Sequence, residues 1–179
     1  MKMVPIAVLG TLALGAAPAR QIKGAQFAEV ARVDGTELKL TGLGVRNRWF
    51  IDVYVAGLYL ADPSREALAD QPRQMTLYML RDVGRDQVAH AIREGFEKNS
   101  ARDMPKLKER LEKLIQALTD VKKGETLIFT YQPQKGTTVT GRGTVLAQIQ
   151  GRDFGEALFA VWLGRNPVDE SLKRGLLGK

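Results

Sequence analysis

The sequence from Leu38 to Leu60, LKLTGLGVRNRWFIDVYVAGLYL, constrains the fold more than any other part of the chain. From Trp49 to Leu60 it is almost continuously apolar, and its only polar groups are Asp52 and the phenol oxygens of Tyr54 and Tyr59. Strands covered on both faces have such continuous apolar runs, whereas half-exposed strands alternate. We therefore expect a central strand over 49–60 with other elements packed on each face.

Two arginines precede this strand. Arg46 and Arg48 follow the sequence Gly42-Leu-Gly44, which predicts a break between a short strand and the long one. The guanidinium group is a planar fork suited to bidentate contact with a carboxylate or another oxyanion. Tyr54 on the adjoining strand can donate a second hydrogen bond to the same anion. Spacing alone fits equally well with Arg46 in solvent and Tyr54 in the core. We set aside a phosphate-binding loop, because no helix follows the two glycines.

The remaining periodicity indicates an α+β fold with helices on one side of an antiparallel sheet. Further strands are predicted at 27–33, 36–40, 75–80, 126–131, 137–140 and 144–149. Helices are predicted from Gly84 to about Asn99, from Asp103 to the C-cap sequence Lys122-Lys123-Gly124, over the segment that carries Phe154 to Trp162, and over 169–177. A short helix capped by Ser64 is also expected after the central strand.

Composition excludes several classes of function. The chain has 179 residues, enough for one domain with a core, and no cysteine, so disulfides, thiolate nucleophiles and cysteine zinc sites are absent. We see no carboxylate cluster with ligand spacing and predict neither a metal site nor a cofactor. The one histidine, His90, lies opposite the apolar stripe of its helix and is expected to be solvated. The formal net charge of +7 is dispersed among acidic residues, so nucleic-acid binding is not expected.

The first 19 residues have the pattern of a secretory signal peptide. Lys2 supplies a minimal positive region, Val4 to Leu14 is a short apolar stretch, and Ala17-Pro18-Ala19 provides the small residues of a cleavage site. We therefore expect a signal peptide at 1–19 and a mature domain at 20–179, periplasmic or secreted. A buried N-terminal strand and an uncleaved anchor are the alternatives.

Two segments resemble the chalcone isomerase-fold family, in particular its bacterial chalcone isomerase-like proteins. The first runs from Gly42 through Arg46 and continues from Phe50 to Leu60; the second runs from Phe154 to Gly164 and Pro167 and ends at Leu176-Leu-Gly178. The resemblance implies an open-faced β-sandwich, in which a layer of helices covers a large antiparallel sheet with a ligand cleft between them.

The resemblance also implies roles for particular residues. Plant chalcone isomerases close an ortho-hydroxychalcone to a flavanone, and Arg46 matches the arginine that holds their anionic nucleophile. Tyr54 stands in place of a strand threonine, as in related plant fatty-acid-binding proteins whose arginine and tyrosine hold a carboxylate. Gln87, Glu94 and Val161 stand where the enzymes have a helix tyrosine, an asparagine and a C-terminal-helix hydroxyl residue, and an acid at Glu94 can repel a phenolate substrate.

Three functional hypotheses follow. The preferred one is an exported, non-catalytic binder of a small amphipathic anion such as a fatty acid, held by Arg46 and Tyr54, with no cofactor and no stable membrane insertion after signal cleavage. The alternative is an isomerase, an intramolecular lyase of the chalcone–flavanone type, that acts through Arg46. The third is a structural or interaction protein whose cleft is filled by Phe50, Tyr78 and Trp162.

Overall fold

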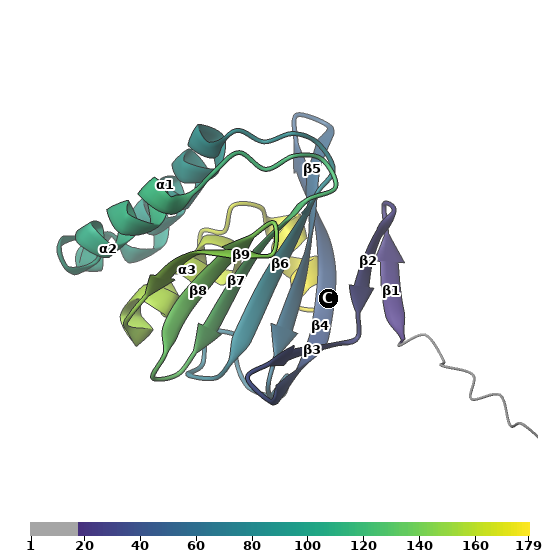
Figure 1. Ribbon diagram of the computed structural model, residues 1–179, viewed down its shortest axis with the longest axis horizontal. Coiled ribbons are helices and arrows are strands. Elements are labelled where there is room, and N and C mark those ends of the chain that lie inside the picture. Colours follow the sequence, from purple (N-terminus) through teal and green to yellow (C-terminus); the bar gives the residue numbers. More distant parts are fainter. Residues whose placement is uncertain (1–17) are drawn as a thin grey trace, which may run out of the picture.

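The computed structural model describes residues 18–179, and the predicted signal segment therefore lies outside the described residues except for its last two. A seven-stranded sheet, antiparallel throughout, dominates the fold, with its strands in chain order from one edge to the other (Figure 1). The strands are β3 (Val30–Val33), β4 (Thr36–Arg48), β5 (Ile51–Leu60), β6 (Arg73–Met79), β7 (Thr126–Gln132), β8 (Gly136–Gly141) and β9 (Thr144–Ile149).

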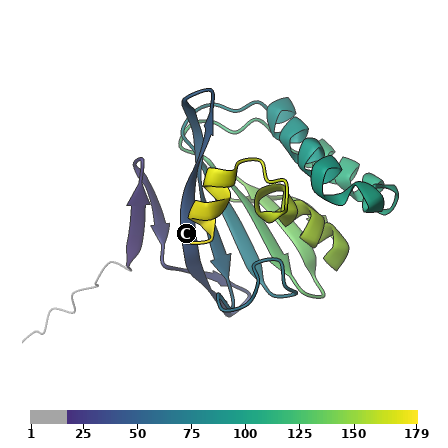
Figure 2. The same cartoon turned by 180° about the vertical axis from the view of Figure 1, so that it is seen from behind.

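Helices cover one face of this sheet. They are α1 (Arg85–Ser100), a 3-10 turn (Ala101–Asp103), α2 (Met104–Ala117), α3 (Arg152–Leu163) and α4 (Glu170–Leu176). Seen from behind, α3 and α4 lie in front of the sheet, and α1 and α2 form a pair at its side (Figure 2). Their apolar side chains and those of β5, β6 and β7 form the main core. The architecture is the α+β open-faced β-sandwich that the sequence predicted.

A small hairpin covers part of the other face. It consists of β1 (Ala19–Ile22) and β2 (Ala25–Ala28), which form a separate two-stranded sheet. Phe27 of β2 packs with Val55 and Tyr59 of β5 in a second, smaller core. The Tyr59 hydroxyl donates to the backbone oxygen of Ala28 at 3.0 Å. Because β5 is covered on both faces over most of its length, the prediction of a central, doubly covered strand is confirmed from Ile51 onward. Its start was wrong, since Trp49 and Phe50 form an exposed turn with positive φ before the strand.

The two glycines of β4 do not break the strand, and that prediction was wrong. β4 runs without interruption from Thr36 to Arg48. A Cβ atom on Gly44 would lie 2.7 Å from the backbone oxygen of Leu172, and one on Gly42 would overlap the backbone oxygen of Gly175. The glycines are therefore the places where the backbone of α4 approaches the strand too closely for any side chain.

The helix expected at Ser64 does not form. Residues 61–72 make a loop of turns, in which Asp62 accepts hydrogen bonds from the backbone nitrogen and the hydroxyl of Ser64, at 3.0 and 2.6 Å. The aspartate therefore caps a turn where the serine was expected to cap a helix. The expected strand over 27–33 is also divided, since β2 ends at Ala28 and β3 begins at Val30.

The second helix is shorter than predicted. α2 ends at Ala117, and Leu118 has extended backbone angles. Val121 then pairs with Val83 as an isolated bridge, through backbone hydrogen bonds of 2.9 Å in both directions. Lys122 and Lys123 therefore belong to the turn that leads into β7, not to a helix end.

Candidate functional site

The pairing of β4 with β5 places the two predicted site residues side by side. Arg46 is directly opposite Tyr54 in the antiparallel register, just before an irregularity that shifts the pairing at Asn47. Opposite residues of an antiparallel pair project from the same face of the sheet. Tyr54 packs against the main core, so both side chains are on the face that the helices cover.

These residues line a cavity of about 430 Å³ between the sheet, α1 and α3. Its interior is apolar, and its wall there consists of Val53, Leu77, Met79, Val83, Val88, Ala91, Ile92, Phe129, Val161, Trp162 and Val168. Its exposed lining residues, which form the mouth, are Arg48, Trp49, Ile51, Arg81, Asp82 and Gln87. The volume and the apolar wall with a few polar groups are typical of small-molecule sites.

Hydrogen bonds fix the position of Arg46 at this cavity and leave some of its N–H donors unpaired. Its Nη1 donates to Oδ2 of Asp169 at 3.1 Å and to the backbone oxygen of Asn47. The side chains of Arg46 and Asp169 are 19% and 17% exposed. Asp169 also caps α4, since its Oδ1 accepts from the backbone nitrogen of Leu172 at 2.9 Å. Nε and Nη2 of Arg46 have no hydrogen-bond partner within residues 18–179, so part of the fork remains available to an anion.

Tyr54 is a neutral hydrogen-bond donor. Its hydroxyl oxygen accepts a hydrogen bond from Nε1 of Trp162 at 3.0 Å. Burial raises the pKa of Tyr54 to about 12, against the opposing influence of the Trp162 hydrogen bond and of Arg46. The phenol therefore stays protonated at neutral pH and cannot act as a base there. Its hydroxyl proton has no acceptor among the described residues, so it is free to bond an anion in the cavity.

The fold and this site can now be compared with known proteins. The sequence matches the family described as chalcone isomerase-like over residues 19–178. The chain belongs to the chalcone isomerase-like family. Among solved structures, the fold is similar to that of a fatty-acid binding protein from Arabidopsis thaliana, with a TM-score of 0.69 and 16% sequence identity. The match covers 89% of this chain and 96% of the plant protein. No curated protein sequence matches significantly.

Gln87, Glu94 and Val161, which the resemblance implies as replacements of enzyme residues, lie in different surroundings in this chalcone isomerase-like protein. Gln87 and Val161 line the cavity. The side-chain oxygen of Gln87 accepts from the backbone nitrogen of Gly84 at 3.0 Å, at the start of α1. Glu94 does not line the cavity; it pairs with Lys98 at 2.6 Å on the outside of α1. Glu94 also interacts electrostatically with Arg48 at the mouth, so the repulsion of an anionic substrate by Glu94 stays a prediction. His90 is 77% exposed, as predicted.

The residues expected to fill the cleft do not fill it. Phe50 is 99% exposed, and Tyr78 packs against the smaller core on the opposite face of the sheet. Trp162 does line the cavity, where it orients Tyr54. The alternation of side chains along a strand could have excluded Tyr78 from the cleft, because its neighbours Leu77 and Met79 are on the cavity side.

Sequence reasoning named Arg48 but missed the other two charged residues of the mouth. Arg81 and Asp82 follow β6 and join Arg48 at the mouth of the cavity. Their only sequence signal was their position directly after a strand. The three arginines at the site outnumber Asp82 and Asp169, so the charge balance favours an anionic ligand. Within the described residues no group of three His, Asp or Glu side chains is arranged to hold a metal ion.

Proposed function

We propose that this chalcone isomerase-like protein binds a small amphipathic carboxylate, such as a fatty acid, without catalysing a reaction. The observation that carries the proposal is the pair formed by Arg46 and Tyr54 beside an apolar cavity of about 430 Å³. Nε and Nη2 of Arg46 and the hydroxyl proton of Tyr54 are donors without protein acceptors in the described chain. A carboxylate offers the matching acceptors, and charge-assisted hydrogen bonds are stronger than neutral ones.

The apolar wall suits the hydrocarbon part of such a ligand. Burial of one methylene contributes about 0.8 kcal/mol, so eight buried methylenes contribute about 6 kcal/mol. The head-group contacts of Arg46 and Tyr54 add to this affinity and set the orientation of the ligand. The plant protein with a similar fold is a fatty-acid binding protein, and this analogy supports the same ligand class.

A second candidate function is an intramolecular lyase reaction of the chalcone–flavanone type. The observation that favours it is the juxtaposition of an arginine with a neutral phenol donor, since the first can hold a phenolate and the second can polarise a ketone. Turnover of an ortho-hydroxychalcone above the spontaneous rate, lost in Arg46→Ala, would establish this activity.

We further propose that the protein is exported. The apolar segment before Ala17-Pro18-Ala19 supports a cleaved signal, and cleavage near Arg20 retains all of β2 and nearly all of β1. Expression of the full chain in a bacterium, followed by mass measurement of the periplasmic fraction, tests this proposal. A protein that keeps Met1 and stays in the cytoplasm would contradict it.

Native mass spectrometry of protein purified without detergent tests the binding proposal. We expect a stoichiometric bound mass, identified after extraction as an acyl carboxylate. Arg46→Ala should lose it. The matched control is Arg32→Ala, which removes an exposed arginine paired with Glu37 on the β3–β4 hairpin and should keep the ligand. Loss of the ligand from both variants, or from neither, would contradict a role for Arg46.

A further inference from the structure

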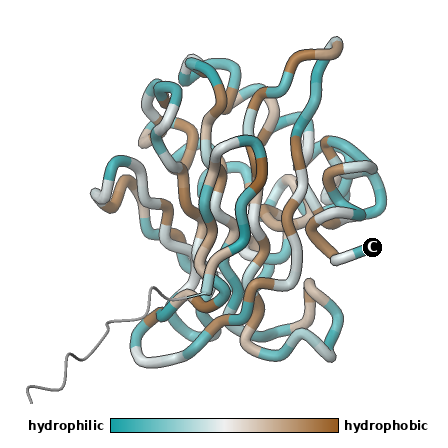
Figure 3. The backbone as a smooth tube through the Cα atoms, turned by 90° about the vertical axis from the view of Figure 1, so that its right-hand side faces the viewer, coloured by the Kyte–Doolittle hydropathy of each residue, from teal (hydrophilic) through white to brown (hydrophobic). Residues whose placement is uncertain are grey.

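The tip of the β4–β5 hairpin is an exposed apolar surface that the cavity alone does not explain. It consists of Trp49, Phe50 and Ile51, which are 82%, 99% and 48% exposed. The tip projects at the top of the molecule, and Figure 3 colours part of it hydrophobic. The other large exposed apolar side chains in the described chain, Val30 and Val145, are single residues on the two edge strands of the sheet. The tip is thus a cluster of three consecutive apolar residues.

The backbone at this tip is unfavourable for the residues that occupy it. Trp49 and Phe50 form a two-residue connection, and both have positive φ, 52° and 64°. Such turns favour Asn-Gly, and a positive φ in a bulky residue costs about 1–3 kcal/mol. Exposed aromatic rings recover little of this cost by packing within the protein. The two aromatic residues therefore lower the stability of the free protein, and contact with something outside the protein is needed to offset that loss.

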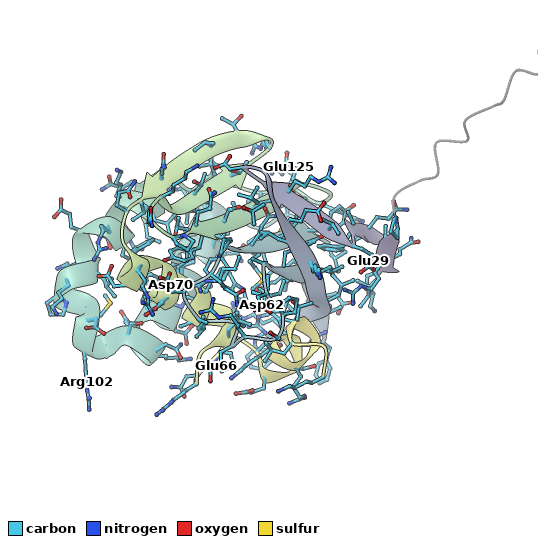
Figure 4. All side chains as sticks on the ribbon, turned by 90° about the horizontal axis from the view of Figure 1, so that it is seen from below. Glu29, Asp62, Glu66, Asp70, Arg102 and Glu125 are labelled. Atoms are coloured by element: carbon cyan, nitrogen blue, oxygen red, sulfur yellow. The ribbon has the colours of Figure 1, made fainter. Side chains whose placement is uncertain are left out.

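Two arginines lie near the tip. Arg48 flanks it on β4, and Arg81 is beside it at the mouth of the cavity. The nearby carboxylates are compensated: Asp52 pairs with Lys23 at 3.0 Å, and Asp82 pairs with Lys122 at 3.3 Å. Glu94, whose charge interacts with Arg48, pairs with Lys98 at 2.6 Å. Figure 4 views the molecule from below, from the end opposite the tip, and three of the carboxylates that it labels, Asp62, Glu66 and Asp70, belong to the β5–β6 connection; Asp70 pairs with Arg152 at 3.7 Å.

We propose that the tip docks the protein on a bilayer surface that contains anionic lipid. Tryptophan and phenylalanine insert at the interface between head groups and acyl chains, and arginines beside them bind lipid phosphates. A protein partner fits the tip less well. Two aromatic side chains bury about 300–500 Å², whereas a specific protein interface needs about 1,000 Å² or more. The docking is peripheral and reversible, and in the described chain no helix is long and apolar enough to cross a membrane.

Docking by the tip places the mouth of the cavity against the lipid. Arg48, Trp49 and Ile51 belong both to the tip region and to the cavity lining. An acyl ligand then passes between bilayer and cavity without crossing bulk water. This consequence rests on the proposed function, whereas membrane docking itself does not.

Co-sedimentation with large vesicles tests the docking without any added ligand. We expect binding to vesicles of equal parts phosphatidylglycerol and phosphatidylcholine, weaker binding to phosphatidylcholine alone, and release by salt. Trp49→Asn/Phe50→Gly supplies the residues that the turn prefers, so the variant should fold at least as stably and bind the vesicles at least about tenfold more weakly. Val30→Ser/Val145→Ser removes exposed apolar residues elsewhere and should bind as the wild type does.

A charge series and a fluorescence measurement complete the test. Arg48→Gln/Arg81→Gln should weaken vesicle binding about 30-fold. The control Arg65→Gln/Arg102→Gln, with Arg65 on the β5–β6 connection and Arg102 at the α1–α2 turn, should leave binding unchanged. Brominated lipid should quench Trp49 emission, and Trp49→Phe should bind but lose the quenching. Absent vesicle binding, or undiminished binding by Trp49→Asn/Phe50→Gly, would overturn the proposal. So would a self-association of the wild type that this variant abolishes while neither protein binds vesicles.

Discussion

At the scale of single residues, the site depends on how the hydrogen-bond donors of Arg46 are divided between protein acceptors and a ligand. Arg46 donates to Asp169, and Asp169 in turn caps α4. Arg46 and Tyr54 were predicted as a pair because a tyrosine on the adjoining strand can reach the same anion and because the family resemblance implies it; spacing alone left the pair open. It did not predict Asp169, which is 123 residues away from Arg46 in the chain, nor the hydrogen bond from Trp162 to Tyr54. Both contacts depend on where the C-terminal helices pack, and no local pattern encodes that.

Asp169→Asn should increase affinity for a carboxylate. Asparagine caps helices as well as aspartate does, so α4 should remain formed. Removal of the negative charge frees Arg46 and ends the repulsion of the bound anion, which we expect to tighten binding about fivefold, or about 1 kcal/mol. Calorimetric titration with dodecanoate measures this change, and Asp34→Asn on the β3–β4 turn is the matched control. A folded Asp169→Asn protein with unchanged or weaker affinity would contradict the assigned role of Arg46.

Buried phenols make stability fall at high pH. Burial raises the pKa values of Tyr54, Tyr59 and Tyr131 to about 12 from an ordinary 10.0. The folded state then binds protons more tightly than the unfolded chain, so this stability is fully present below pH 10 and is lost as pH rises towards 12. Urea unfolding at pH about 8 and about 11 should show the decline. Tyr54→Phe should make it shallower; the same decline in that variant would be inconsistent with a buried, neutral Tyr54.

At the scale of elements, the contact between β4 and α4 organises the site. The succession of strands and helices along the chain could be predicted from periodicity, and the structure confirms it from β3 to β9, except for the helix expected at Ser64. β1 (Ala19–Ile22) was not predicted. The glycines of β4 were misinterpreted, because a glycine that breaks a strand and one that admits a neighbouring backbone look identical in sequence. The end of α2 was misplaced for a related reason. Val121 lies outside the helix because its backbone pairs with that of Val83, which is distant in the sequence.

Gly44→Ser should separate α4 from the sheet. A side chain at Gly44 would meet the backbone oxygen of Leu172 at 2.7 Å and its Cδ1 at 2.8 Å. We expect a loss of about 2–3 kcal/mol in the free energy of unfolding, because α4 has to move away from the strand. Gly84→Ser at the start of α1 is the control, because its Cβ has no neighbour closer than 3.8 Å, and it should change stability by a few tenths of a kcal/mol. Equal stability of the two variants in urea unfolding would refute the close-approach explanation.

At the scale of the whole molecule, the cavity lies between a sheet and helices that the chain supplies from distant segments. The α+β class and the family resemblance could be obtained from the sequence, and the fold confirms both. The open cavity could not be obtained, because three aromatic residues were available to fill it. Two of them lie elsewhere: Phe50 at the exposed tip and Tyr78 on the opposite face. The third, Trp162, lines the cavity without closing it.

The central claim is that this cavity binds an amphipathic carboxylate through Arg46. Calorimetric titration of dodecanoate and of dodecanol into the wild type and Arg46→Gln tests it most directly. We predict that the wild type prefers the carboxylate, and that Arg46→Gln loses that preference, at a cost of at least about tenfold in dodecanoate affinity, while dodecanol affinity stays within about twofold. Equal affinity of the wild type for the two ligands, or an unchanged preference in Arg46→Gln, would contradict the account.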